Sequence, residues 1–201
     1  MSKNILIFAS GRGSNAEALH EACEAGDIAG QICGVISDHA DAQVLKRAAR
    51  WGVPTIVCEK KNYPSKEAFD EALLQAAKSF APDLICLAGY MRICAGNLID
   101  AFPNKIINIH PALLPSFRGL HAQRQAIEAG VKIAGCTVHF VGKGLDDGPI
   151  ITQVAVPVAE GDTEDSLSAR ILKEEHKAYV RAVKAFCEDR LRVEGNVVFG
   201  A

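Results

Sequence analysis

The chain has 201 residues, of which 49% are hydrophobic and 23% are charged, enough to build a sizeable core and too apolar for a disordered chain. A formal net charge of -2 excludes the basic surface expected of a protein that binds nucleic acid or an anionic membrane. No apolar run approaches the roughly 18 residues of a transmembrane helix, and the first residues lack a signal-peptide layout. Seven cysteines without a C-x-x-C pair indicate reduced core thiols of a cytoplasmic protein and no metal site.

Strand-like and helix-like segments alternate along the chain. Apolar runs predict strands at residues 4–9, 31–37, 54–58, 83–89, 105–110, 135–141 and 150–158. Apolar residues at helical spacing predict helices at 14–25, 41–52, 65–80, 121–129 and 163–189, with Ser65 as an N-cap. This alternation predicts an α/β, Rossmann-like fold: a mostly parallel twisted sheet of about seven strands with helices on both faces. The partial alternation within 135–141 and 150–158 suggests places nearer a sheet edge. Ligands of such sheets bind at the carboxyl ends of the strands.

The first strand ends in a glycine-rich loop, and residues 11–16 match G-x-G-x-x-A. One interpretation is a dinucleotide site, with Asp38 after the second strand as the acid for the ribose. Another is a site for a single phosphate, held by the start of the helix and by Ser14 and Asn15. A tight turn in which Ser14 merely caps the helix is the ordinary alternative.

The fifth strand ends in two polar residues, Asn108 and His110. Because they are two positions apart in a strand, their side chains share a face. Pro111 ends the strand there, so both groups lie at the edge where a ligand would sit. An amide beside an imidazole can stabilise and protonate an oxyanion. The alternative is a buried polar pair satisfied by the backbone.

Residues 142–149, "GKGLDDGP", connect the last two predicted strands and carry the adjacent acids Asp146 and Asp147. Aspartate and glycine are ordinary turn residues, so a flexible hairpin is one interpretation. The other is that one acid reaches His110, since a carboxylate favours the cationic imidazole.

These three stretches closely resemble the folate-dependent formyltransferases, over about Asn4 to Arg190. The resemblance is carried by "SGRGSN" (10–15), "LAGYMRI" (87–93), "NIHPALLPSFRG" (108–119), "TVHFV" (137–141), "LDDGPII" (145–151) and "EEHKAY" (174–179). It implies the formyltransferase fold, with 10-formyltetrahydrofolate as co-substrate. The "SGRGSN" loop looks specific to members that formylate the amine of 5'-phosphoribosylglycinamide in purine biosynthesis, and so favours one phosphate over a dinucleotide.

The resemblance also implies roles for individual residues. His110 is expected to donate a proton, Asn108 to bind the oxyanion and Asp146 to favour the charged imidazole. Gly13, Ser14 and Asn15 match the loop for the substrate phosphate, and Glu175 matches a residue that binds the ribosyl-glycinamide. Residues that match the folate pocket are Lys66, Met91, Arg92, Ile93, Cys94, Asn108, Gly142, Lys143, Gly144 and Leu145. Lys66 stands where some members have arginine, so its role is less defined.

We expect residues 1–201 to form a single domain, with substrate bound by the part up to about residue 100 and folate and catalysis in about 101–190. The length leaves no room for the extra domains of the methionyl-tRNA formyltransferases or the deformylases. Two other functions stay open: hydrolysis of formyltetrahydrofolate, which the phosphate loop argues against, and a nicotinamide-dependent oxidation built on residues 11–16 and Asp38. Apart from its small-molecule substrates the sequence indicates no partner, and it leaves a homodimer open.

Overall fold

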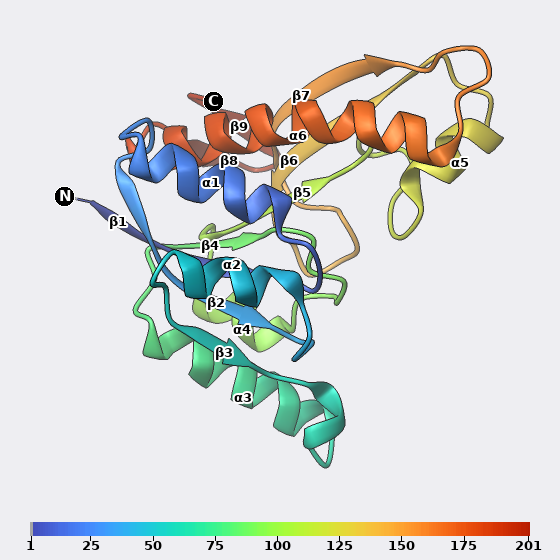
Figure 1. The fold of residues 1–201 in the computed structure, drawn as a ribbon. Helices are drawn as coiled ribbons and strands as arrows, with labels where there is room; N and C mark the ends of the chain where they lie inside the picture. The colour runs from blue at the N-terminus through green and yellow to red at the C-terminus, as the bar shows by residue number, and fades with distance from the viewer. Residues whose placement is uncertain (1) are drawn as a thin grey trace. The chain divides into compact units, whose positions relative to one another are not determined.

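A computed structural model describes residues 2–201, which contain nine strands and form two compact units that divide after Ile107 (Figure 1). The α/β class and the mostly parallel sheet agree with the prediction, but the strand count of about seven is too low. Within residues 2–201, no helix has the length and apolar character needed to cross a membrane.

The first unit is a parallel α/β arrangement. Its elements are β1 (Lys3–Phe8), α1 (Ser14–Glu24), β2 (Gly30–Ser37), α2 (Gln43–Arg50), β3 (Thr55–Val57), the 3₁₀ helix η1 (Lys60–Asn62), α3 (Lys66–Ser79), β4 (Leu84–Leu87) and α4 (Gly96–Ala101). The strands lie in the order β3-β2-β1-β4, and every pair is parallel. The chain reverses its direction across the sheet after β3, and Figure 1 shows α1 and α2 side by side and α3 and α4 as a second pair. The carboxyl ends of β1 and β4 lie beside each other at this reversal.

The core of the first unit follows from its sequence. The central strands β1 and β4 are apolar runs whose last four residues are fully buried, as expected for strands covered on both faces. The Ser65 hydroxyl accepts a hydrogen bond from the Ala68 N–H, which confirms the predicted N-cap of α3.

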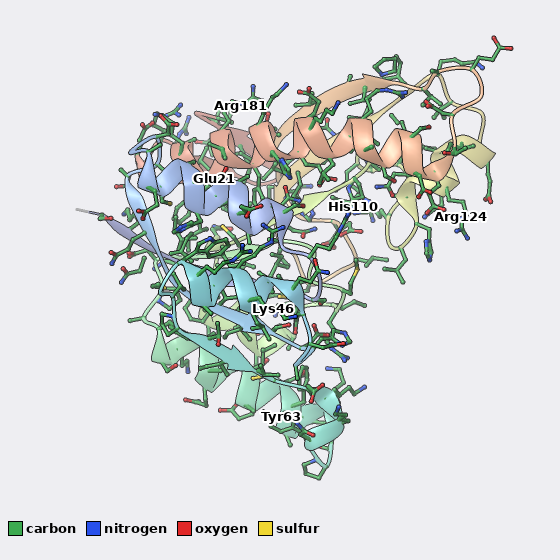
Figure 2. All side chains as sticks on the ribbon, viewed as in Figure 1. Glu21, Lys46, Tyr63, His110, Arg124 and Arg181 are labelled. Carbon is green, nitrogen blue, oxygen red and sulfur yellow. The ribbon has the colours of Figure 1, made fainter. Side chains whose placement is uncertain are left out.

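The second unit combines antiparallel and parallel pairing. Its elements are α5 (Ala122–Glu128), β6 (Ile133–Phe140), β7 (Ile150–Pro157), α6 (Glu164–Cys187), β8 (Arg192–Glu194) and β9 (Val197–Phe199), and β5 (Ile106–His110) enters it from the division point. β6 pairs antiparallel with β7, and β9 pairs parallel with β7 and antiparallel with β8. The long helix α6 packs on β6 and β7. Arg124 of α5, labelled in Figure 2, forms an ion pair with Glu164 at the start of α6 (2.8 Å).

The sixth and seventh strands were expected nearer a sheet edge, and neither of them is the edge strand itself. β6 is buried along nearly its whole length, and β9 and β8 lie beyond β7. Thr137 of β6 is polar yet fully buried because its hydroxyl donates to the Ala112 carbonyl (2.6 Å) and accepts from the Leu114 N–H (3.0 Å). The alternation of apolar and polar residues in β6 therefore reflects buried hydrogen bonding and not a solvent-exposed face of the sheet.

Candidate active site

His110 is the last residue of β5 and is almost completely buried, with 5% of its surface exposed (Figure 2). Its Nε2 lies 2.8 Å from the carbonyl oxygen of Phe117. Because a carbonyl can only accept, Nε2 carries the proton of this hydrogen bond. Its Nδ1 lies 3.5 Å from Oδ2 of Asp146. Both ring nitrogens thus face oxygen atoms of the protein.

Asp146 lies in the loop between β6 and β7, in a left-handed backbone conformation (φ 47°). Its Oδ2 also accepts a hydrogen bond from the Gly119 N–H at 2.8 Å, so the carboxylate joins this loop to the segment that follows β5. At Gly148 a Cβ atom would lie 1.8 Å from the Phe140 carbonyl oxygen, so only glycine fits the close return of the chain into β7. The loop is a hairpin connection, and the same connection presents Asp146 to His110.

Asn108 contacts a second histidine of the same unit. Its amide nitrogen lies 3.2 Å from Nε2 of His139, and Nδ1 of His139 lies 2.8 Å from the Phe140 carbonyl oxygen. The proton of the ring is therefore on Nδ1, and Nε2 accepts from the amide. Burial lowers the pKa of His139, which agrees with a neutral ring. The contact fixes which end of the Asn108 side chain is the NH₂ group and leaves its second N–H for another acceptor.

Asn108, His110, Asp146 and His139 together form what we call the catalytic cluster. Oδ1 of Asp146 lies 3.9 Å from Nε2 of His139, so both histidines flank one carboxylate. A cationic ring beside a carboxylate, next to an oriented amide, can stabilise negative charge on an oxygen and supply a proton. Within residues 2–201 no group of three or more His, Cys, Asp or Glu side chains is placed to hold a metal ion.

Asp147 forms its hydrogen bond within its own loop. Its Oδ2 accepts from the Gly144 N–H at 3.1 Å and so braces the loop that carries Gly142, Lys143 and Leu145. Leu145 is 47% exposed, which leaves an apolar side chain at the surface of the loop expected to cover the folate.

The glycine-rich loop after β1 leads directly into α1. Gly13 is the N-cap with φ 74°, and no side chain caps the helix, so the interpretation of Ser14 as a cap is wrong: Ser14 is the first helical residue. A Cβ atom on Gly13 would lie 2.6 Å from the Val44 side chain, so glycine is needed there for packing as well as for the backbone conformation. Asn15 is buried in the first turn, and Arg47 Nε donates to the Arg12 carbonyl at 2.9 Å.

Ser10 joins this loop to the segment that follows β4. Its N–H donates to the Gly89 carbonyl (3.1 Å), and its hydroxyl accepts from the Met91 N–H (2.9 Å). The predicted phosphate loop and the predicted folate segment are therefore hydrogen-bonded to each other.

The segment Met91–Cys94 has an exposed apolar part and a buried thiol. Met91 and Ile93 are 67% and 72% exposed, which suits contact with a flat apolar ligand. Burial raises the pKa of Cys94 to about 12, so this thiol is unreactive near neutral pH. Arg92 lies between Met91 and Ile93 in the sequence and forms an ion pair with Asp38, with 2.6 Å between Arg92 Nε and Asp38 Oδ2. Asp38 is buried and engaged in this ion pair, so it does not present the free carboxylate that a nucleotide ribose requires.

Two predicted site residues differ in their surroundings. Glu175 is 7% exposed and lies on the buried face of α6. Lys66 is exposed and bonds to Asp70 one turn further along α3, and this carboxylate raises the pKa of Lys66.

Sequence reasoning did not assign His139 or the Phe117 carbonyl to the site. His139 lies in "TVHFV", two residues after Thr137 on the same face of β6, and that spacing was the available signal. The Phe117 carbonyl had no signal, because its direction depends on a left-handed backbone (φ 55°) at a non-glycine residue.

Comparisons with known proteins agree with this arrangement. The family model described as formyl transferase matches residues 3–183. The chain is 40% identical over 196 residues to the phosphoribosylglycinamide formyltransferase of Escherichia coli, covering 98% of this chain and 92% of that protein. The crystal structure of glycinamide ribonucleotide transformylase 1 from Symbiobacterium toebii is 52% identical with a TM-score of 0.96, covering 98% of this chain and 93% of that one. A formyltetrahydrofolate deformylase from Pseudomonas syringae is 27% identical with a TM-score of 0.92, covering all of this chain but 66% of that one. The chain therefore belongs to the formyl transferase family.

Proposed function

We propose that this enzyme transfers the formyl group of 10-formyltetrahydrofolate to the amine of 5'-phosphoribosylglycinamide, yielding formylglycinamide ribonucleotide and tetrahydrofolate in purine biosynthesis in the cytoplasm. The observation that carries the proposal is the catalytic cluster, in which His110 faces Asp146 at 3.5 Å beside an oriented amide. Relatives named for this activity match at high identity over nearly their full length, whereas the deformylase matches at 27%.

The roles within the cluster follow from hydrogen-bonding capacity. Attack of an amine on a formyl carbon places negative charge on the formyl oxygen. The Asn108 amide keeps one N–H to donate to that oxygen, because His139 accepts the other. In this step His110 begins as the imidazolium, which the Asp146 carboxylate stabilises, and donates to the departing folate nitrogen the Nε2 proton that faces the Phe117 carbonyl in this structure. The ring is then neutral until it takes up the proton that the attacking amine loses.

The binding roles use the loops of the first unit and of the β6–β7 connection. Backbone N–H groups at the start of α1, together with Ser14 and Asn15, suit one phosphate monoester. Met91 and Ile93 in the first unit, and separately Leu145 in the second, expose apolar side chains of the kind that suits the ring system of the folate, which supplies the formyl group. Glu175 accepts from hydroxyl or amide groups of the ribosyl-glycinamide. The other proposed folate-binding residues are Lys66 and Cys94 in the first unit and residues 142–144 in the second, and the number of subunits is left to measurement.

The test is an assay of the purified enzyme with and without the ribonucleotide. Formylglycinamide ribonucleotide should form only when both substrates are present, and formate release without the ribonucleotide should be slow. His110→Ala should lower turnover by about 10²–10⁴-fold while both ligands still bind. His121→Ala is the matched control, because this histidine is exposed and pairs with Glu164 at the start of α6. Formate release as fast as transfer would instead assign a hydrolase.

A further inference from the structure

Asp38 is a charged residue with almost no access to water. It follows β2 directly, at the carboxyl end of the strand, and only 3% of its surface is exposed. A buried carboxylate is costly unless it is paired, and removing the partner of such a group destabilises the site strongly. The partner of Asp38 therefore shows what the charge is for.

The nearest partner is Arg92 in the predicted folate segment, at 2.6 Å, whereas Nε2 of His39 lies 3.6 Å from the same carboxylate oxygen. Arg92 Nε donates to Asp38 Oδ2 at 2.6 Å, and the guanidinium lies over the Phe69 ring, 5.5 Å from its centroid. One contact holds the Nε edge and the other holds a face of the guanidinium, so its plane is fixed. Within residues 2–201 Arg92 makes no other hydrogen bond or ion pair, and its side chain is 33% exposed. Within residues 2–201 the Nη groups of Arg92 therefore have no hydrogen-bond partner.

Such a guanidinium suits an anionic group, because its paired Nη donors match carboxylate or phosphate oxygens. It lies between Met91 and Ile93, whose exposed apolar side chains suit the rings of a ligand that also carries that anion. A folate has both parts: flat rings and carboxylates.

Tyr90 supplies a contrast in the same surroundings. It is buried, its ring packs edge-on against Phe8, and its hydroxyl has no hydrogen-bond partner within residues 2–201. Burial first, and the Asp38 carboxylate second, raise the pKa of Tyr90, so the phenol stays neutral. Its hydroxyl has no contact with Arg92 that could position the guanidinium.

We propose that Asp38 is a positioning residue that holds Arg92 ready to bind a carboxylate of the folate co-substrate. The proposal rests on the proposed function. It assigns to Asp38 a role in folate affinity through Arg92 and no contact with either substrate.

The experiment compares Asp38→Ala, Asp38→Asn and Arg92→Ala with two controls, Tyr90→Phe and the exposed Asp41→Ala. KM for both substrates and kcat are measured, together with direct binding of two folate analogues, one with its glutamate tail and one without any carboxylate. Asp38→Ala should raise KM for the folate about tenfold, with the KM for the ribonucleotide and kcat nearly unchanged. Asp38→Asn should raise KM for the folate much less than Asp38→Ala does, because the asparagine keeps an oxygen that accepts a hydrogen bond from Arg92 Nε.

The binding data separate positioning from a general structural effect. Asp38→Ala should weaken the analogue with the glutamate tail and leave the other unchanged, and the double variant Asp38→Ala/Arg92→Ala should bind like Arg92→Ala alone. Equal weakening of both analogues, additive effects in the double variant, or a comparable loss in Tyr90→Phe would overturn the proposal. Binding needs no turnover, so a wild-type enzyme that transfers no formyl group would refute the proposed function and leave this test readable.

Discussion

Nε2 of His139 accepts a hydrogen bond from the Asn108 amide at 3.2 Å, and this accepting role exists only while the ring is neutral. Burial lowers the pKa of His139 below its ordinary value, so the neutral form prevails in the folded protein near neutral pH. His139, to which the sequence assigned no role, thus orients the amide of Asn108, a predicted catalytic residue.

We expect His139→Leu to lower kcat by roughly 10–100-fold with little change in either KM. The variant removes the hydrogen bond that orients the Asn108 amide, whereas the backbone of Asn108 stays in position. Steady-state kinetics measure the effect. Asn108→Ala should cost at least as much, and the double variant should be no worse than Asn108→Ala alone. Independent, additive losses would contradict an action of His139 through Asn108.

The lowered pKa of His139 should also make the stability of the folded protein depend on pH. A histidine whose pKa is lower in the folded state stabilises the fold fully above its ordinary value, and the contribution is lost as pH falls toward the folded value. Wild-type protein should therefore lose stability as pH falls below about 6.5, and His139→Leu should lose less over that range. Thermal unfolding between pH 5 and pH 8 tests this, and parallel curves for the two proteins would contradict it.

The adjacent acids of the β6–β7 loop form an internal control. Asp146→Asn should lower turnover by about 10²-fold or more, because it removes the charge that faces His110 Nδ1. Asp147→Asn should be mild, because its amide oxygen can still accept from the Gly144 N–H. Turnover measured against pH compares the two. Similar defects in both variants would mean that the loop acts through its general charge or rigidity.

The phosphate loop contains two glycines that respond differently to an added Cβ atom. At Gly13 the new atom would meet Val44, so a substitution there disturbs the protein whether or not phosphate binds. At Gly11 the new atom meets no protein atom within 4 Å. We expect Gly11→Ala to leave the thermal unfolding temperature unchanged but to raise KM for the ribonucleotide more than KM for the folate, because the ligand approaches the backbone closely. Unchanged KM for the ribonucleotide would place the phosphate elsewhere.

The start of α6 should show a separate effect of pH on stability. Asp162 accepts from Arg170 (2.7 and 2.9 Å) and from Ser166 (2.7 Å), and the Arg170 guanidinium holds the pKa of Asp162 well below its usual range. Such a group stabilises the fold fully above its ordinary pKa, and the contribution is lost as pH falls through the lower folded value.

Asp162→Asn should therefore lower the unfolding temperature by about 2–4 °C at neutral pH, and the difference from wild type should narrow below about pH 4. Asp165→Asn is the control, since this exposed carboxylate lies in the first turn of the same helix. A constant difference at all pH values would show that Asp162 acts through something other than its charge.

Much of the fold could be predicted from the sequence because the strands β1, β4 and β5 are continuous apolar runs and because α3 has an apolar face and a serine cap. The hairpin of β8 and β9 could not, since three residues in each strand are too few to show a period. The sequence could not show that Thr137 and His139 of β6 are buried. Thr137 bonds to the Ala112 carbonyl and His139 to the Asn108 amide, both more than 20 positions away, and such contacts depend on the tertiary fold, which no local pattern encodes.

The candidate site divides in the same way. Asn108, His110 and Asp146 stand at strand ends or in a loop, where residue type and spacing indicate chemistry. The ion pair of Asp38 with Arg92 joins residues 54 positions apart, so the sequence could name Asp38 only as the acid of the dinucleotide interpretation, which the family resemblance disfavours. Only the structure shows that its charge is already in use.

The hydrogen bonds of Ser10 have a consequence for the thermodynamics of ligand binding. Ser10 bonds through its N–H and its hydroxyl to Gly89 and Met91, so the loop proposed for the phosphate and the segment proposed for the folate are ordered as one unit. A ligand that orders one of these two segments also orders the other, and so lowers the conformational entropy that is lost when the second ligand binds. Cooperativity of this kind is reciprocal: the ribonucleotide should tighten folate binding by the same factor by which the folate tightens ribonucleotide binding. An enzyme built in this way favours the ternary complex over either binary one, which keeps the reactive formyl donor from being held alone beside water.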